Sequence, residues 1–76
     1  MNKVRRKQLQ EIIEQIDAIM GALEDLQQEE EECRDNMPEN LQCSERYERA
    51  DDACNNMNDA ISSLEDAISS LEDATE

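Results

Sequence analysis

The sequence contains no histidine, tryptophan or phenylalanine, and only one tyrosine, one glycine and one proline. Without histidine, and with no activated nucleophile or fixed carboxylate pair in an evident cleft, the chain lacks the groups that enzymes use for catalysis. A structural zinc site is disfavoured too, because the three cysteines lie ten and eleven residues apart and no fourth ligand accompanies them. We therefore expect a protein that is not an enzyme and that holds no metal and no cofactor.

Long hydrophobic runs are also missing. No stretch approaches the roughly 20 apolar residues that a bilayer-spanning helix needs. The basic opening, residues 1–7, passes directly into an acidic amphipathic segment and lacks the apolar middle of a signal peptide. These features predict a cytoplasmic protein without membrane contact. A disulfide between Cys33 and Cys43 is conceivable across a turn, but a cytoplasmic setting argues against it.

The charge is strongly one-sided, with 21 acidic and 7 basic residues and a formal net charge of −14. Four of the bases lie in residues 1–7, so the rest of the chain carries 3 bases against 21 acids, a net −18. A surface this acidic repels nucleic acid and anionic lipid, so we expect no direct nucleic-acid binding. Three interpretations fit the charge: solubility alone, a basic protein partner, or a display of charge that mimics nucleic acid.

Apolar residues, by contrast, recur with a seven-residue period in both halves of the chain. In the first half the two rows are Leu9, Ile16, Leu23 and Glu30, and Ile12, Ile19, Leu26 and Cys33. In the second half they are Tyr47, Cys54, Ile61 and Ile68, and Ala50, Met57, Leu64 and Leu71. Each residue of the rows in the first half can be paired with one of the rows in the second half so that their numbers sum to 80, as in Leu9 with Leu71. If the chain folds back near residue 40, the rows of the first half therefore face the rows of the second half in register. This symmetry predicts an all-α fold, an antiparallel helical hairpin of the coiled-coil type.

We expect a single domain over residues 1–76, with one helix over about 3–35, a turn over 36–43 and a second helix over about 44–74. Pro38 ends the first helix, because proline cannot donate to the helical ladder and disfavours helical geometry at the preceding residue. Ser44 is the expected N-cap of the second helix, since its hydroxyl can accept a hydrogen bond from an amide just downstream. Leu41 is expected to cover the end of the core.

The apolar surface is wider than one partner helix needs, which indicates an oligomer. Ile13 and Met20 widen the apolar stripe of the first helix. In the second helix, residues 60–66 repeat identically as 67–73, and the duplication creates a row of alanines that another helix could approach closely. The high helix propensity of alanine is an alternative reason for this row. We predict a four-helix bundle or a larger homo-oligomer, a dimer being the first choice, with this interface: Ile13, Met20, Ala53, Ala60, Ala67 and Ala74.

Basic residues crowd the start of each predicted helix and acidic residues its end, which is the unfavourable sign for the helix dipole. One explanation is pairing within the hairpin, where the basic start of the first helix meets the acidic end of the second, and Arg46 and Arg49 meet residues 29–32. The other is anion binding, because arginines beside free helix amides suit a phosphate. Tyr47 is then the only ring available to stack on a base. The candidate anion- or nucleotide-binding residues are Arg5, Arg6, Lys7, Arg46, Tyr47 and Arg49.

The turn segment, residues 36–42 (Asn-Met-Pro-Glu-Asn-Leu-Gln), and the Ser-Glu-Arg-Tyr-Glu run at residues 44–48 resemble a recurring segment of small acidic, uncharacterised proteins of bacteriophages and prophages. The basic opening and the closing Ala-Ile-x-x-Leu-Glu heptads are similar to the same group. The resemblance implies a phage-type origin, hence the host cytoplasm, and a helical hairpin shape. It implies no activity and no site residue.

Three functions are therefore expected, none of them catalytic. The first is a phage-type binding protein that acts stoichiometrically on a host factor, such as a defence protein, through an acidic helical surface that could mimic nucleic-acid charge. The second is a homo-oligomeric sponge that sequesters a phosphate-bearing nucleotide signal at the basic helix N-termini. The third is a structural or assembly adaptor whose helices pair with a partner helix.

Overall fold

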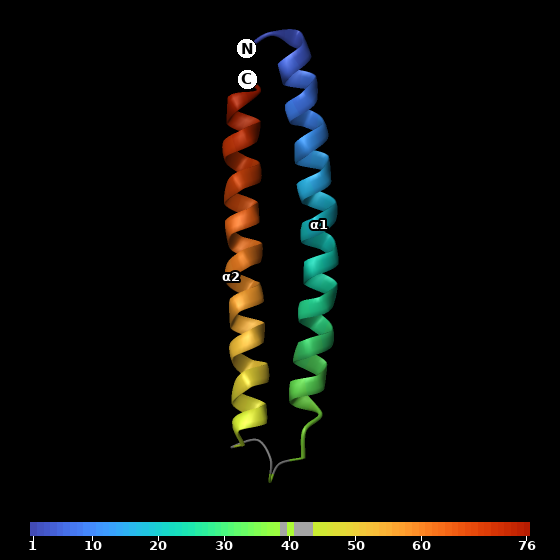
Figure 1. Cartoon of the computed structure of the whole chain (residues 1–76), viewed down its shortest axis with the longest axis vertical. Coiled ribbons are helices and arrows are strands. Elements are labelled where there is room, and N and C mark those ends of the chain that lie inside the picture. The colour runs from blue at the N-terminus through green and yellow to red at the C-terminus, as the bar shows by residue number, and fades with distance from the viewer. Residues whose placement is uncertain (39, 41–43) are drawn as a thin grey trace.

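The chain forms two long α-helices that lie side by side and run in opposite directions (Figure 1). The structure is a computed structural model that describes residues 1–38, 40 and 44–76. Helix α1 spans Lys3–Asp35 and helix α2 spans Glu45–Ala74, and the molecule measures 59 × 15 × 12 Å. The two termini meet at one end and the turn lies at the other (Figure 1). The predicted all-α fold with two packed helices is confirmed.

Both helices begin at a residue whose side chain caps a free backbone amide. Asn2 has an extended backbone, and its Oδ1 accepts a hydrogen bond from the Arg5 amide at 2.8 Å. Ser44 is likewise extended, and its Oγ accepts from the Tyr47 amide at 3.3 Å. Each cap satisfies one of the donors that a helix start leaves unpaired. The predicted N-cap role of Ser44 is confirmed.

The turn follows the end of α1 at Asn36, whose backbone amide bonds to the carbonyl of Glu32 at 2.9 Å. The expected role of Leu41 as a cover for the core, and any role of Cys43, lie outside the described residues. Cys33 carries a free thiol. Within the described part of the chain, neither helix contains a segment both long and apolar enough to span a membrane.

Helix α2 presents the two predicted rows to α1. Ala50, Cys54 and Ile61 are the buried residues of the hairpin, at 6%, 3% and 6% exposure. The other members of both rows are half-buried, namely Tyr47, Met57, Leu64, Ile68 and Leu71. No described side chain reaches complete burial, and α1 contributes no buried residue. The core is therefore a single thin seam between two rods.

Helix α1 is rotated relative to the sequence-based expectation. Its first row is half-buried as predicted, but its second row in the seam consists of Ile13, Met20, Gln27 and Arg34. The row predicted for that place is exposed, with Ile12 at 44%, Ile19 at 59% and Leu26 at 56%. Cys33 of the same row is exposed as well. The predicted packing of these four side chains in the core of the hairpin is wrong.

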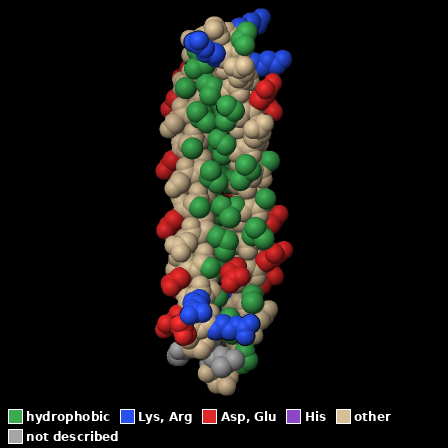
Figure 2. Space-filling model, viewed as in Figure 1, with side chains coloured by type: hydrophobic (Ala, Val, Ile, Leu, Met, Phe, Trp, Pro, Cys, Tyr) green, Lys and Arg blue, Asp and Glu red, His purple; other side chains and the backbone are tan. Residues whose placement is uncertain are grey.

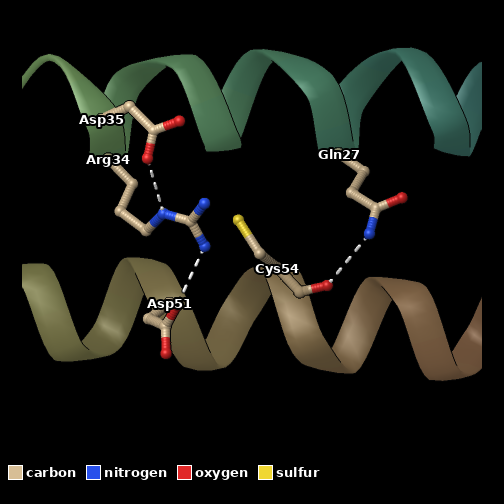
Figure 3. Close-up of polar contacts among 5 residues, drawn as sticks. All are labelled: Gln27, Arg34, Asp35, Asp51 and Cys54. Carbon is tan, nitrogen blue, oxygen red and sulfur yellow. Dashed lines mark hydrogen bonds and ion pairs between the residues drawn. The ribbon is translucent and has the colours of Figure 1, made fainter.

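Polar contacts at the turn end accompany this rotation (Figure 3). The side-chain Nε2 of Gln27 donates to the backbone carbonyl of Cys54 at 3.3 Å, and the Arg34 Nη1 donates to Asp51 Oδ1 at 2.8 Å. Both long side chains cross from α1 to α2 only if their row faces α2. The apolar residues on that row, Ile13 and Met20, then enter the seam, and the row of Ile12 and Ile19 turns outward.

Candidate functional site

Two rows of apolar side chains lie on one side of the hairpin, which we call the apolar face. In α1, Ile12 directly precedes Ile13, which is half-buried in the seam. In α2, Ala60 directly precedes Ile61, which is buried there. Because the helices are antiparallel, residues one step before the seam turn toward the same side of the pair. The apolar face consists of Ile12, Ile19, Leu26, Ala53, Ala60, Ala67 and Ala74.

The apolar face is continuous along the hairpin. Figure 2 shows a band of hydrophobic side chains that runs along the length of the molecule, with acidic side chains on both edges. Ala60 and Ala74 are exposed, whereas Ala53 and Ala67 are half-buried beside the seam. Exposed large apolar side chains that gather in one patch are typical of a surface that another molecule covers.

The positions bordering the apolar face carry no charge over its central part. On α1 the bordering row precedes the first seam row by one residue and contains Gln8, Gln15 and Ala22. On α2 the bordering row lies one residue before the seam row of Met57, and it contains Asn56, Ser63 and Ser70. No acidic residue of the described chain lies on this central part. The apolar face is thus a neutral surface on a molecule that is acidic elsewhere.

Most of the acids are exposed on the remaining surface. One row on α2 places an exposed carboxylate at every seventh residue, and its members are Glu45, Asp52, Asp59, Asp66 and Asp73. At 1.5 Å per residue, neighbours in this row stand about 10 Å apart along the helix. Among the described acidic residues, only Asp35, Asp51 and Glu45 form ion pairs. Most of the acidic surface is therefore not neutralised within the chain.

Arg34 links the two helices at the turn end, where its guanidinium group reaches between them (Figure 3). Its Nε donates to Asp35 at 3.1 Å and its Nη1 to Asp51 at 2.8 Å. The hydrogen bond with Asp35 is the main reason that the pKa of Arg34 is raised. Nearby, burial raises the pKa of the Cys54 thiol, and Arg34 partly opposes this shift. The pair with Asp51 joins α1 to α2, which is a structural role.

The predicted anion-binding residues fall into two groups at opposite ends of the rod. Figure 2 shows the basic side chains gathered at these two ends. Arg5, Arg6 and Lys7 lie at the start of α1, where the Arg6 Nη2 donates to the Met1 carbonyl at 3.3 Å. The second group, residues 46–49, lies at the start of α2. The chain does not bring the two groups together.

Within the second group the side chains have different surroundings. Arg49 pairs with Glu45 on the same helix, and Tyr47 is half-buried. Arg46 lines a shallow hollow of about 420 Å³ at the turn end. The other described residues that line it are Cys33, Asn36, Met37, Pro38 and Ser44. This hollow contains a single base, so one chain offers no cluster of positive charge there.

The predicted charge pairing across the helices is wrong in its partners. Within the described ranges, no ion pair joins Arg46 or Arg49 to residues 29–32, or the basic start of α1 to the acidic end of α2. Arg34, which the sequence analysis did not single out, makes the cross-helix pair instead. Its signal in the sequence was its place on the same heptad row as Ile13 and Met20.

The predicted oligomer interface divides between two surfaces of the hairpin. Ile13 and Met20 lie in the seam with α2, whereas the alanine row lies on the apolar face.

The described residues contain no group of three or more acidic or cysteine side chains placed to hold a metal ion. No protein-family model matches the chain, and no curated protein and no solved structure matches it either.

Proposed function

We propose that the chain is a non-catalytic binding protein whose exposed carboxylates bind a basic surface of a partner protein. The observation that supports this proposal is the unneutralised charge: 21 acids face 7 bases, and three carboxylates of the described chain form ion pairs. The helices space these carboxylates at regular intervals along the rod. A partner with matching basic groups is then attracted over a long range and bound in one orientation.

The density of this charge can be compared with that of nucleic acid. A net charge of −14 along 59 Å is one charge per about 4.2 Å. Duplex DNA carries one charge per about 1.7 Å. Two hairpins side by side carry −28 over the same 59 Å, which is one charge per about 2.1 Å. We therefore propose that a homodimer is the form that competes with nucleic acid for a basic surface.

A displacement assay tests this function. Fluorescently labelled duplex DNA is bound to a basic, sequence-nonspecific DNA-binding protein, and the chain is added at several salt concentrations. We expect it to displace the DNA at low salt. Its direct binding to the same protein, measured without DNA, should weaken as salt rises, because exposed charges are screened within about 8 Å at physiological ionic strength. Direct binding that salt does not affect would contradict the proposal, and so would a chain that displaces no DNA at low salt.

Matched variants separate charge from shape in this assay. Replacing Asp52, Asp59, Asp66 and Asp73 with asparagine removes four exposed charges from one row. Replacing the same four with glutamate keeps the charges and changes only the side-chain length. The asparagine variant should displace DNA less well and with a weaker salt dependence, whereas the glutamate variant should act like the unmodified chain. Equal behaviour of the two variants would exclude this row from the binding surface.

A second function, the structural or assembly adaptor, is favoured by one observation, the exposure of Ile12, Ile19 and Leu26. In this function a helix of another protein would cover the apolar face. It requires that the face be open in the isolated protein. The oligomeric state therefore decides between the adaptor and the acidic homodimer.

A further inference from the structure

The hairpin exposes more surface than a compact protein of its mass. A compact monomer of 8.8 kDa should expose roughly 4,800 Å². The hairpin exposes 5748 Å². The excess of roughly 950 Å² is close to the roughly 800 Å² that each partner buries in a standard protein interface. One further interface of standard size would reduce the exposed surface of the chain to about that of a compact protein of its mass.

The apolar face has large side chains on one helix and small ones on the other, at matching heights. Ile12 and Ala67, Ile19 and Ala60, and Leu26 and Ala53 have numbers that sum to 79. The contact of Gln27 with Cys54, a sum of 81, shows that residues with such sums lie level in the hairpin. Each large side chain of α1 is thus level with an alanine of α2. Two such faces are complementary in shape when α1 of one covers α2 of the other.

The distribution of charge also favours a second copy as the occupant. Two chains of −14 repel each other wherever their acids meet. On the central part of the apolar face there are no acids, and the bordering rows carry glutamine, asparagine, serine and alanine. Face-to-face contact therefore keeps the acids of both copies on the outside, in water. A charged partner would find no complementary charge on this surface, whereas an identical neutral face matches it.

We propose that two copies pack through their apolar faces about a twofold axis parallel to the helices. In this arrangement α1 of each copy packs on α2 of the other, Ile19 of one copy lies against Ala60 of the other, and the four helices form an antiparallel bundle. The alternative twofold axis, across the helices, would stack α1 on α1 and α2 on α2. It would place large side chains on large ones and alanines on alanines, which leaves one side crowded and the other underpacked. The assembly does not depend on what the acidic surface binds.

Sedimentation equilibrium measures whether the dimer forms. The chain should have twice its mass of 8.8 kDa, and Ile19→Asp, which puts a charge at the centre of the apolar face, should return it to 8.8 kDa. Ile19 is 59% exposed in the single hairpin, so circular dichroism should show that the variant stays helical. Ser62→Asp is the matched control, because it adds the same charge at a similar height on the opposite side of α2 and should leave the dimer intact. A monomeric unmodified chain would overturn the proposal and favour the adaptor function. An unchanged dimer in Ile19→Asp would overturn it as well.

Disulfide trapping tests the arrangement of the two copies. In a chain with Cys33→Ser, Cys43→Ser and Cys54→Ala, a single cysteine is introduced by Ile19→Cys in one sample and by Ala60→Cys in another. Oxidation of the mixed samples should give the I19C–A60C linked pair, because these positions of different copies are adjacent in the proposed bundle. Each sample alone should give little linked product. Efficient self-linking of I19C, or a dimer without the mixed product, would contradict the proposed axis.

Discussion

Ile61 is the residue whose truncation tests the seam most sensitively. It is 6% exposed and lies in the middle of the two seam rows of α2. Ile61→Ala removes three carbons, and at about 0.8 kcal/mol for each buried methylene the transfer term alone is about 2.4 kcal/mol. Its neighbours in the seam are only half-buried, so they can relax into the space and keep the cavity term small. We expect a loss of about 2.5 kcal/mol.

The matching thermal shift follows from the chain length. With an unfolding entropy of about 2.1 cal/mol/K per residue, 76 residues give about 0.16 kcal/mol/K, so the loss lowers Tm by about 16 °C. Urea and thermal unfolding are followed by far-ultraviolet circular dichroism at one protein concentration, because the stability of an oligomer depends on concentration. Val4→Ala is the control, since Val4 is 67% exposed at the start of α1 and should cost less than about 0.5 kcal/mol. Equal losses for the two variants would refute the seam.

Three further predictions concern single residues. Gly21→Ala should stabilise the chain by about 1 kcal/mol, or about 6 °C in Tm, because Gly21 is helical and an added Cβ meets nothing within 4 Å; an unchanged Tm would contradict this. Burial raises the pKa of the Cys54 thiol, so as pH rises through the ordinary value of 9.0 the unfolded chain loses the thiol proton before the folded chain does. The free energy of unfolding should therefore fall as pH rises above 9.0. Urea titrations at several pH values should show a smaller fall for Cys54→Ala. In a Cys43→Ser chain, a thiol reagent should modify the exposed Cys33 in the folded state and Cys54 only on unfolding; equal rates would contradict the burial of Cys54.

The helices of the hairpin could be predicted from the sequence because the signals at their ends are local. Pro38 and Ser44 mark the helix ends through backbone chemistry that depends on neither partner nor packing. On α2 only two adjacent rows carry large apolar side chains, and the next row is alanine. The face that α2 turns toward α1 was therefore determined by side-chain size.

The rotation of α1 could not be predicted in the same way. Ile12 and Ile13 both follow Leu9 at a helical spacing, so apolar rows flank the first seam row on both sides. Hydrophobic periodicity favours the row of Ile12, which is apolar at four successive heptad positions, over the row of Ile13, which continues with Gln27 and Arg34. The polar contacts of Gln27 and Arg34 with α2 distinguish them, and a pattern of apolar residues ignores such contacts. A pattern of apolar residues therefore places the row of Ile12 in the core and does not reveal the apolar face.

The partners of the charged side chains could not be predicted from the sequence either. Arg46 and Arg49 were expected to meet the acidic end of α1, but Arg34 pairs across the helices and Arg49 pairs along its own helix. Charged side chains at a surface choose among several partners of similar energy, so sequence spacing alone does not select one. What a neutral or an acidic face binds depends further on a second molecule, which one sequence does not describe.

An isotope-filtered nuclear Overhauser experiment tests most directly whether α1 divides its apolar residues between two neighbours. A mixture of carbon-13-labelled and unlabelled chains reports only contacts between copies. The methyl groups of Ile19 should show intermolecular contacts with Ala60, and Met20 should contact α2 of its own chain only. Intermolecular contacts from Met20 would contradict its place in the seam. An Ile19 without intermolecular contacts would contradict the packing of two apolar faces.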